Sequence, residues 1–356
     1  MATIKDVARL AGVSTATVSA TINNSAYVSP ALRERVEQAI DVLGYAPDRV
    51  AQSLKRGRTN LIGLIVADIT NPYFTTLVQT VERLLEAEGF SVLLSDTDQD
   101  PHRDASCLEL MKSNRVDGVI LAPSVSTHGA ALSKHLTMPL VLVDRMIFGI
   151  RADYVGLDNH KAAHLAVERI VSLGHEKIGI IAGPQNLTSG RERYDGAKKS
   201  LKDFRIGIRN EYIIFCNFRE EEAYIATKTL LTSMDPPTVL FVSNNLMLIG
   251  VMNALADLSL SCPEDISVVS VDDFPWASAF RPRPTVIRQP VAQIAEDCVH
   301  LLMHRISNGN TGDGETRLHV PELVMRDSLA APRRNGRATS RVRVDPAGAL
   351  TPQPGS

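Results

Sequence analysis

The sequence predicts a two-part α/β protein, in which a small helical unit precedes a body of two lobes with parallel sheets. Three observations lead to this prediction. Apolar positions in residues 4–43 recur with helical spacing between turn signals. From Leu61 onward, continuous apolar runs alternate with amphipathic stretches, which is typical of parallel strands covered by helices on both faces. These runs are too many for one compact sheet, so two similar lobes are expected.

The composition of the 356-residue chain excludes several classes of protein. Hydrophobic residues make up 44% and charged residues 22%, which are ordinary values for a globular protein. No run approaches the roughly 18 apolar residues of a membrane span, and residues 1–25 do not resemble a secretory signal. The four cysteines stand far apart and the histidines lack ligand spacing. We therefore expect a cytoplasmic protein without a membrane segment, a metal site or a cofactor.

The net charge of −2 conceals an uneven distribution along the chain. Residues 1–60 contain eight Lys and Arg against five Asp and Glu, and residues 331–356 contain five Arg against one Asp. The intervening segment is therefore acidic. A basic N-terminal unit before an acidic body favours a polyanionic partner at the N-terminus.

The helical unit has the pattern of a helix-turn-helix. Gly12 is expected to end the first helix, and the Ser14 hydroxyl to cap the second. A third helix is expected after Ser29, which would cap it, with Pro30 at its first position. Two short helices joined by Gly-Val-Ser and braced by a third suit either DNA reading or docking to a protein.

The second helix has the features of a DNA reader. Its N-terminus carries partial positive charge, and its first turns expose small side chains and hydroxyls. These side chains belong to Thr15, Ala16, Thr17 and Ser19.

Residues 47–60 are expected to form a basic hinge. One or two helical turns within this segment are too short to be stable alone in water, so they would fold on a partner. Leu54, beside Lys55 and Arg56, suits a wedge that enters the minor groove while the cations hold phosphates. A solvated linker is the alternative.

These segments together resemble the LacI/GalR family of bacterial transcriptional regulators. The resemblance rests on IKDVARLAGVSTATVSATINN, on VSPALRERVEQAIDVLGYAPDRVAQSLKRGRTNLIGLIVADITNPYF and on the later strand pattern, over residues 2 to about 330. It implies a DNA-binding helix-turn-helix domain in residues 1–46, a hinge in 47–60 and a periplasmic-binding-protein-like sensing body in 61–330. Residues 331–356 are rich in Arg, Pro, Gly, Ser and Thr without an apolar period, which predicts a disordered tail.

By position, the resemblance assigns the contacts with operator DNA. Thr15, Ala16 and Ala20 would face bases, Thr17, Ser19 and Asn23 would lie near phosphates, and Leu54 would be the wedge, flanked by Lys55 and Arg56. An alanine at position 20 can contact a thymine methyl group but cannot form a bidentate hydrogen bond with guanine.

The body is expected to contain seven strands and seven helices. The strands are LIGLIVA, FSVLLS, DGVILA, PLVLVD, KIGIIAG, TVLFVS and ISVVSVDD. The helices span residues 73–88, 102–115, 159–174, 190–203, 219–232, 245–258 and 290–308. The resemblance implies that lobe 1 comprises about residues 61–160 and 290–320, and lobe 2 about 161–289 and 321–330.

Polar and aromatic residues follow the expected strands, where ligands bind in sheets of this type. The resemblance implies that Asp144, Arg191, Asn244 and Asp272 contact a ligand, that Arg145 joins them, and that Tyr73, Phe74 and Phe218 form walls. Such a site suits a sugar or a sugar derivative, and a purine is the alternative.

Each of these residues also has a purely structural interpretation. The two aspartates could cap strand ends, and Tyr73 and Phe74 could be ordinary packing. Arg191 or Arg193 could bridge a carboxylate on the other lobe.

The sequence thus predicts a ligand-switched repressor that binds a palindromic operator as a homodimer. Ligand binding would change the spacing of the two hinges and so either release DNA or strengthen its binding. The helix at 73–88, with Val78, Val81, Leu84 and Leu85, is either the dimer face or core. The resemblance implies that tetrameric members carry a C-terminal leucine heptad, and because none is visible in this sequence, a dimer is expected.

The sequence disfavours two other functions. A transport binding protein would have no use for residues 1–60, and an enzyme would need a catalytic constellation that the sequence does not contain.

Overall fold

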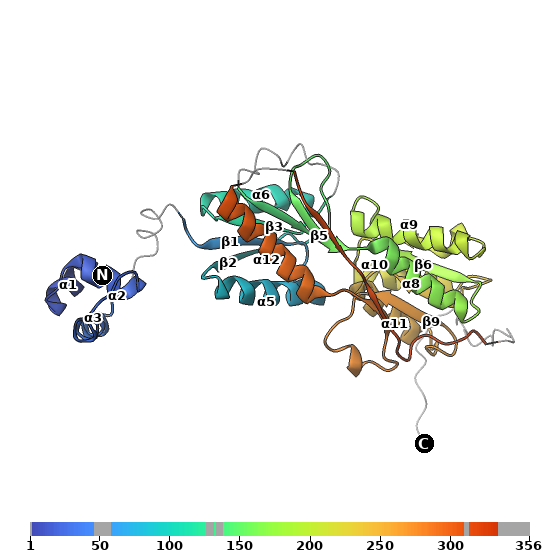
Figure 1. Cartoon of the computed structure of the whole chain (residues 1–356). Helices are drawn as coiled ribbons and strands as arrows, with labels where there is room; N and C mark the ends of the chain where they lie inside the picture. Colours follow the sequence, from blue (N-terminus) through green and yellow to red (C-terminus); the bar gives the residue numbers. More distant parts are fainter. Residues whose placement is uncertain (1, 46–57, 126–131, 133–137, 310–312, 334–356) are drawn as a thin grey trace, which may run out of the picture. The chain divides into compact units, whose positions relative to one another are not determined.

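The computed structural model describes residues 2–45, 58–125, 132, 138–309 and 313–333. The chain divides into two compact units, Met1–Asn60 and Leu61–Ser356, drawn in Figure 1. Leu54, Lys55 and Arg56, the expected wedge and its flanking cations, lie outside the described residues.

The first unit consists of α1 (Ile4–Ala11), α2 (Thr15–Asn23) and α3 (Pro30–Leu43). Gly12 ends α1 in the left-handed conformation with φ of 63°, and the Ser14 hydroxyl caps α2 by accepting from the Thr17 amide at 3.1 Å. The expected side-chain cap by Ser29 is wrong. Its backbone carbonyl instead accepts from the amides of Leu32 and Arg33, both at 3.0 Å, while Pro30 sets the first turn.

This unit has an apolar core of its own. The buried residues are Val7, Ala8, Ala11, Val18, Val36 and Ala39, which come from all three helices. Small side chains at three of these positions let the short helices approach closely. The unit therefore holds α2 in place without help from the rest of the chain.

The second unit contains two six-stranded sheets. The first has the order β11-β5-β4-β3-β1-β2 with all neighbours parallel. Its strands are β1 (Leu61–Val66), β2 (Ser91–Asp96), β3 (Gly118–Leu121), β4 (Leu140–Val143), β5 (Asp153–Leu157) and β11 (Thr316–His319). The second has the order β12-β10-β9-β8-β6-β7 and is parallel except for β12. Its strands are β6 (Ile178–Ala182), β7 (Ile213–Phe215), β8 (Val239–Val242), β9 (Ser267–Val271), β10 (Thr285–Arg288) and β12 (Glu322–Val324).

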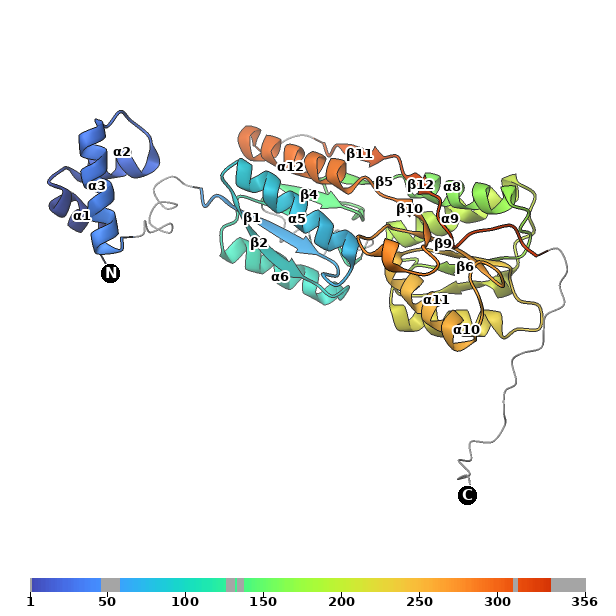
Figure 2. The ribbon, with the colours of Figure 1, turned by 90° about the horizontal axis from the view of Figure 1, so that it is seen from below.

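Helices cover both faces of each sheet, as Figure 2 shows. The first sheet, with α5 (Pro72–Ala87), α6 (Pro101–Ser113) and α12 (Val291–Asn308), forms lobe 1. The second sheet, with α8 (Asn159–Ser172), α9 (Thr188–Asp203), α10 (Glu220–Leu231) and α11 (Asn245–Asp257), forms lobe 2. All seven expected helices are present, with ends displaced by at most two residues, because their apolar faces and capping residues are local signals.

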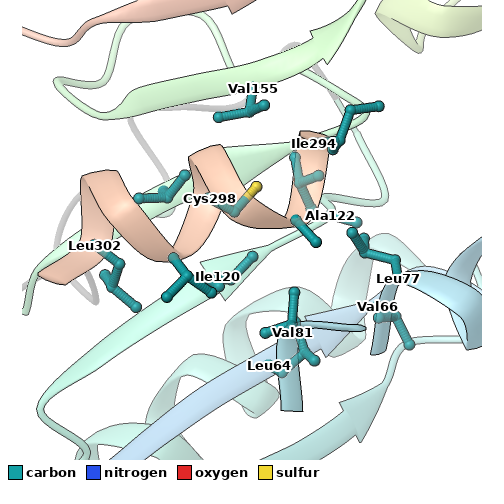
Figure 3. Close-up of a cluster of buried hydrophobic side chains, with 14 of the residues drawn as sticks. Leu64, Val66, Leu77, Val81, Ile120, Ala122, Val155, Ile294, Cys298 and Leu302 are labelled. Atoms are coloured by element: carbon teal, nitrogen blue, oxygen red, sulfur yellow. The ribbon is translucent and has the colours of Figure 1, made fainter. Parts of the chain in front are cut away.

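One core cluster of lobe 1 decides the role of the helix at 73–88. Figure 3 shows α12 packed over the sheet through Cys298 and Leu302, with Val81 of α5 beside Leu64. Val81 and Leu85 are completely buried in this cluster, and Val78 and Leu84 pack against it. Assigning Val81 and Leu85 to a dimer face is therefore wrong, since these side chains belong to the core.

Five strands were missing from the sequence prediction. They are β5, β7, β10, β11 and β12. Four of them contain only three or four residues, and β7, β11 and β12 lie at sheet edges with exposed positions, so their apolar signal is weak. The fifth, β5, begins with Asp153, whose buried charge is paired with Arg305 far along the chain.

Within the described residues, the chain passes between the sheets three times: between β5 and α8, between β10 and α12, and between β11 and β12. The Asp158 amide of the first connection donates to the His319 carbonyl of the third at 2.9 Å. This bond ties the first connection to the third. Within lobe 2, Asp273 pairs with Arg288 at the end of β10 at 2.8 Å and with Arg326 after β12 at 2.7 Å. None of the described helices is long and apolar enough to cross a membrane.

Candidate functional site

Strand ends of the two lobes meet in the second unit around Asn71, Met146, Thr188 and Asn245, and this interface between the lobes is called the cleft. Two hydrogen bonds cross it: the Met146 amide donates to Thr188 Oγ1 at 3.0 Å, and Asn245 Nδ2 donates to Asn71 Oδ1 at 3.1 Å. Asn71 caps α5 of lobe 1, and Asn245 begins α11 of lobe 2. The lobes are therefore in contact at the edge where ligands bind in sheets of this kind.

Asp144 and Asp272 directly follow β4 and β9 and occupy equivalent positions in the two lobes. Both adopt the left-handed conformation, with φ of 64° and 73°, and both are buried. A non-glycine residue rarely holds this conformation, and such strain concentrates at functional sites. Their carboxylates contact side chains: Asp144 Oδ2 lies 3.2 Å from Arg145 Nε, and Asp272 Oδ1 accepts from Gln289 at 2.5 Å. These contacts do not resemble strand-end caps.

Burial raises the pKa of Asp272, while the nearby Arg193 charge acts in the opposite direction. The Asp144 charge contributes to the rise, which means that the two carboxylates are near each other. Two carboxylates from opposite lobes thus converge on one buried region.

Arg145 lies between two aromatic rings from different lobes. Its guanidinium carbon is 5.9 Å from the Phe74 ring centre and 5.7 Å from the Phe218 ring centre. Burial lowers the pKa of Arg145, although Asp144 and the flanking π-faces favour its charged form. The space between the two walls is thus filled by a cation.

Arg193 is fully embedded in lobe 2. It donates to Asn159 Oδ1 at 2.8 Å and to the Ser243 carbonyl at 2.6 Å, and it lies 3.6 Å from Asp272. The idea that Arg193 bridges a carboxylate of the other lobe is wrong, because these partners all belong to lobe 2. Arg191 instead reaches lobe 1 through a ring, with its guanidinium 5.6 Å from the centre of Phe148.

Tyr73 combines packing with an unused polar group. The rings of Tyr73 and Phe74 pack edge to face at 5.0 Å within the lobe 1 core, so ordinary packing explains both rings. It does not explain the Tyr73 hydroxyl, which is buried and makes no hydrogen bond within the described residues. Burial raises the pKa of Tyr73, and the charges of Asp144 and Asp272 add to the rise. The hydroxyl therefore lies near both carboxylates.

Phe218 and Asn244 complete the expected residues. Phe218 is buried with φ of 58°, and a Cβ at Gly183 would lie 2.3 Å from its ring, so a glycine leaves room for this wall. Asn244 Oδ1 caps α11 by accepting from the Met247 amide at 2.9 Å. Part of its side chain therefore has a structural role that the sequence did not reveal.

Gln289 was not singled out from the sequence. It immediately follows β10, donates to Asp272, and keeps its buried Oε1 without a partner among the described residues. The buried Ser189 hydroxyl also has no hydrogen-bond partner among the described residues. Ligands bind beyond the carboxyl ends of the strands in such sheets, so recognition of residues 285–288 as a strand would have indicated Gln289. Within the described ranges, no cluster of three or more His, Cys, Asp or Glu side chains is placed to hold a metal ion.

Asp104 of α6 is a buried carboxyl of lobe 1. It is completely buried and accepts from the Ser124 amide at 2.9 Å, while the Ser124 hydroxyl pairs with Thr97 at 2.7 Å. Burial raises the pKa of Asp104 to about 6. The protonated carboxyl therefore favours the folded state. Its contribution to the free energy of unfolding is fully present below the usual aspartate pKa near 4 and is lost as the pH rises through 6.

Replacing Asp104 by asparagine, which still accepts from Ser124, is expected to raise the free energy of unfolding by about 1–3 kcal/mol at pH 7. The gain should shrink as the pH falls from 6 to 4 and vanish below about pH 3, where the carboxyl is neutral in both the folded and the unfolded state. Urea unfolding across this pH range measures it, with the exposed Asp195→Asn as control. A gain that does not change with pH would contradict the assignment.

In the first unit, α2 presents the expected DNA-facing residues. Thr15 and Ala16 are exposed, and Thr17, Ser19, Ala20 and Asn23 are partly exposed. Asn23 Nδ2 donates to the Ser19 carbonyl at 2.8 Å, and the hydroxyls of Thr17 and Ser14 lie 3.0 Å apart. Small side chains and a positive N-terminus remain available to a polyanion.

Comparison with known proteins agrees with both units. Residues 3–48 match the model "Bacterial regulatory proteins, lacI family", and residues 167–329 match "Periplasmic binding protein-like domain". The chain is 36% identical over 335 residues to the HTH-type transcriptional repressor PurR of Haemophilus influenzae (strain PittEE), covering 92% of this chain and 99% of that protein. The chain belongs to the lacI family.

Two further relatives of this lacI-family regulator are informative. The ribose operon repressor of Escherichia coli (strain K12) is 36% identical over 328 residues, covering 91% of this chain and 98% of that protein. The crystal structure of the lac repressor dimer bound to operator and an anti-inducer is similar with a TM-score of 0.82 and 28% identity, covering 93% of this chain and 99% of that one. The chain is a DNA-binding regulator with an α/β body.

Proposed function

We propose that this regulator is a cytoplasmic repressor that binds a palindromic operator as a homodimer. A palindrome is read by two copies of one helix, so two subunits related by a two-fold axis are required. The relatives named as repressors and the lac repressor dimer bound to its operator support this proposal. The chain then acts by binding rather than by catalysis.

We assign one proposed role to each segment of the chain. Residues 1–46 bind DNA, 47–60 form the hinge, 61–330 sense the ligand, and 331–356 are a tail. In α2, Thr15, Ala16 and Ala20 face bases, and Thr17, Ser19 and Asn23 contact phosphates. Leu54 enters the minor groove, and the adjacent Lys55 and Arg56 hold phosphates.

We further propose that the cleft binds a sugar, with ribose as the first candidate. The observation that carries this proposal is the Arg145 guanidinium, which lies between the Phe74 and Phe218 rings. A flat base cannot stack between these walls while the guanidinium is there, whereas a polyhydroxyl ring needs the charged groups that converge here. Sugar hydroxyls donate to Asp144 and Asp272 and accept from arginine and from the unpartnered Tyr73 hydroxyl.

Arg191 and Asn244 complete the proposed set of ligand contacts. The likeness to the ribose operon repressor supports the choice of ribose. The likeness to PurR supports a purine corepressor as the alternative, in which Arg145 would leave the space between the rings.

Titration calorimetry of the full chain with ribose and with purine bases distinguishes these proposals. Ribose is expected to bind at one site per subunit, and the bases to produce no heat of binding. Binding of a purine base without binding of ribose would overturn the sugar proposal and favour the alternative.

A further inference from the structure

A salt bridge joins the lobes at the rim of the cleft, beside the residues proposed to contact ligand. Arg219, which precedes α10 in lobe 2, donates to Asp98 of lobe 1 through the carboxylate at 2.8 Å and through the carbonyl at 2.9 Å. The same guanidinium lies 3.9 Å from the buried carboxylate of Asp68. One cation of lobe 2 therefore faces two anions of lobe 1.

The acceptor side of this bridge is held in an unusual backbone conformation. Asp98 and Gln99 are consecutive non-glycine residues with φ of 50° and 58°. The Gln99 amide donates to the Ala67 carbonyl at 2.7 Å, which fixes the turn against the end of β1. Left-handed residues of this kind persist only where the surroundings enforce them. The turn presents both acceptors of Asp98 to Arg219.

The same turn also reaches the centre of the cleft. Gln99 Nε2 lies 3.5 Å from Asp68, and Gln99 Oε1 lies 3.5 Å from Arg145, the cation between the aromatic walls. Asp68 accepts from the Thr70 amide at 2.9 Å, which fixes its carboxylate. The rim contact and the proposed ligand site thus share one polar network.

The charges of this contact favour a closed cleft. The hydrogen bond that Arg219 donates to the Asp98 carboxylate and the negative charges of Asp98 and Asp68 raise the pKa of Arg219. Separation of the lobes would leave Asp68 without its closest described cation and would break both bonds to Asp98. Because 41% of the Arg219 side chain and 59% of the Asp98 side chain are exposed, dissolved salt weakens the attraction.

We propose that Arg219 and Asp98 form a clasp that holds the lobes closed and sets the apparent affinity for ligand without touching it. The inference rests on the proposed function, since it regulates the same cleft. The apparent dissociation constant equals the intrinsic one divided by the closed fraction, so a weaker clasp weakens binding.

Charge reversal tests the clasp in the full chain. Arg219→Glu is expected to weaken ribose binding by about three- to tenfold, because it places a third negative charge against Asp98 and Asp68. Asp98→Lys should act in the same direction, and the double variant should move the affinity back toward that of the wild type. Arg209→Glu is the matched control, since Arg209 is 42% exposed and pairs with Asp235 inside lobe 2.

A second measurement needs no ligand. The Met146 amide donates to Thr188 across the cleft, so its hydrogen exchange reports opening. Arg219→Glu should accelerate this exchange and Arg209→Glu should not. If Arg219→Glu accelerates the exchange but neither the wild type nor any variant binds ribose, the clasp is supported and the proposal of ribose as the ligand is wrong. If ribose binds the wild type and Arg219→Glu equally and exchange is unchanged, the clasp is wrong and the ligand stands.

Discussion

Replacing Asp272 by asparagine is expected to weaken ribose binding by about 100-fold or more. The carboxylate is 4% exposed and lies near Tyr73 and Asp144, where the lobes converge. A hydrogen bond to a charged group contributes about 1.5–3 kcal/mol, and a carboxylate can accept more than one from a sugar. Asparagine keeps the shape but supplies only one acceptor oxygen and no charge, so a sugar hydroxyl loses its strongest partner.

Operator binding separates this effect from unfolding. The DNA-reading helix is held by the separate core of the first unit, so Asp272→Asn should bind operator DNA without ligand as the wild type does. Asp195→Asn removes the same charge from an exposed position of α9 and should leave ribose affinity unchanged. An unchanged ribose affinity for Asp272→Asn would remove this carboxylate from the site.

Replacing Arg305 by methionine is expected to lower the free energy of unfolding by about 3–5 kcal/mol. Arg305 of α12 and Asp153 of β5 form a buried pair, 6% and 3% exposed, with Arg305 Nη2 at 2.6 Å from Asp153 Oδ1. The Glu315 amide also donates to Asp153 at 2.8 Å. Removing only the cation leaves an uncompensated carboxylate in the interior, which is the costly half of such a change.

The double variant Arg305→Met with Asp153→Asn is the control for this prediction. It removes both charges and keeps an acceptor for Glu315, so it should lose less stability than Arg305→Met alone. Chemical unfolding of both variants at pH 7 measures the difference. Equal losses would mean that the damage comes from packing rather than from an unpaired charge.

The same pair predicts how the wild type responds to acid. Burial opposes ionisation of Asp153, but the hydrogen bonds from Arg305 and Glu315 outweigh it and lower its pKa. A carboxyl whose pKa is lowered by folding stabilises the folded state when it is ionised. This stability is present at pH values above the pKa of the unfolded state and is lost as the pH falls through the pKa of the folded state. This part of the acid sensitivity, below about pH 4, should be missing from the double variant.

Local signals account for the parts of the fold that could be predicted from sequence. Gly12, Ser14 and the apolar spacing of the helices act within a few residues, so the helical unit and all seven helices of the body were predicted. The pairing of Asp153 with Arg305 joins residues 152 apart in sequence, so β5 was missed. The edge strands were missed because half-exposed strands of three or four residues carry little apolar pattern.

The candidate site was partly predictable for the same reason. Residues that follow recognisable strands, such as Asp144 and Asp272, were identified, and each is buried beside an arginine, at 3.2 Å from Arg145 and 3.6 Å from Arg193 respectively. Gln289 follows a strand that was not recognised. The partners of Arg193 come from three separate segments of lobe 2, so its structural role could not be inferred from spacing.

Selection of random duplex DNA by the full chain, followed by salt titration of the enriched sequence, tests the proposed function most directly. We expect a palindrome of two half-sites about 10 base pairs apart, centre to centre, bound with steep salt dependence. An enriched site without two-fold symmetry, or no enriched site with or without ribose, would contradict a dimeric, operator-binding regulator.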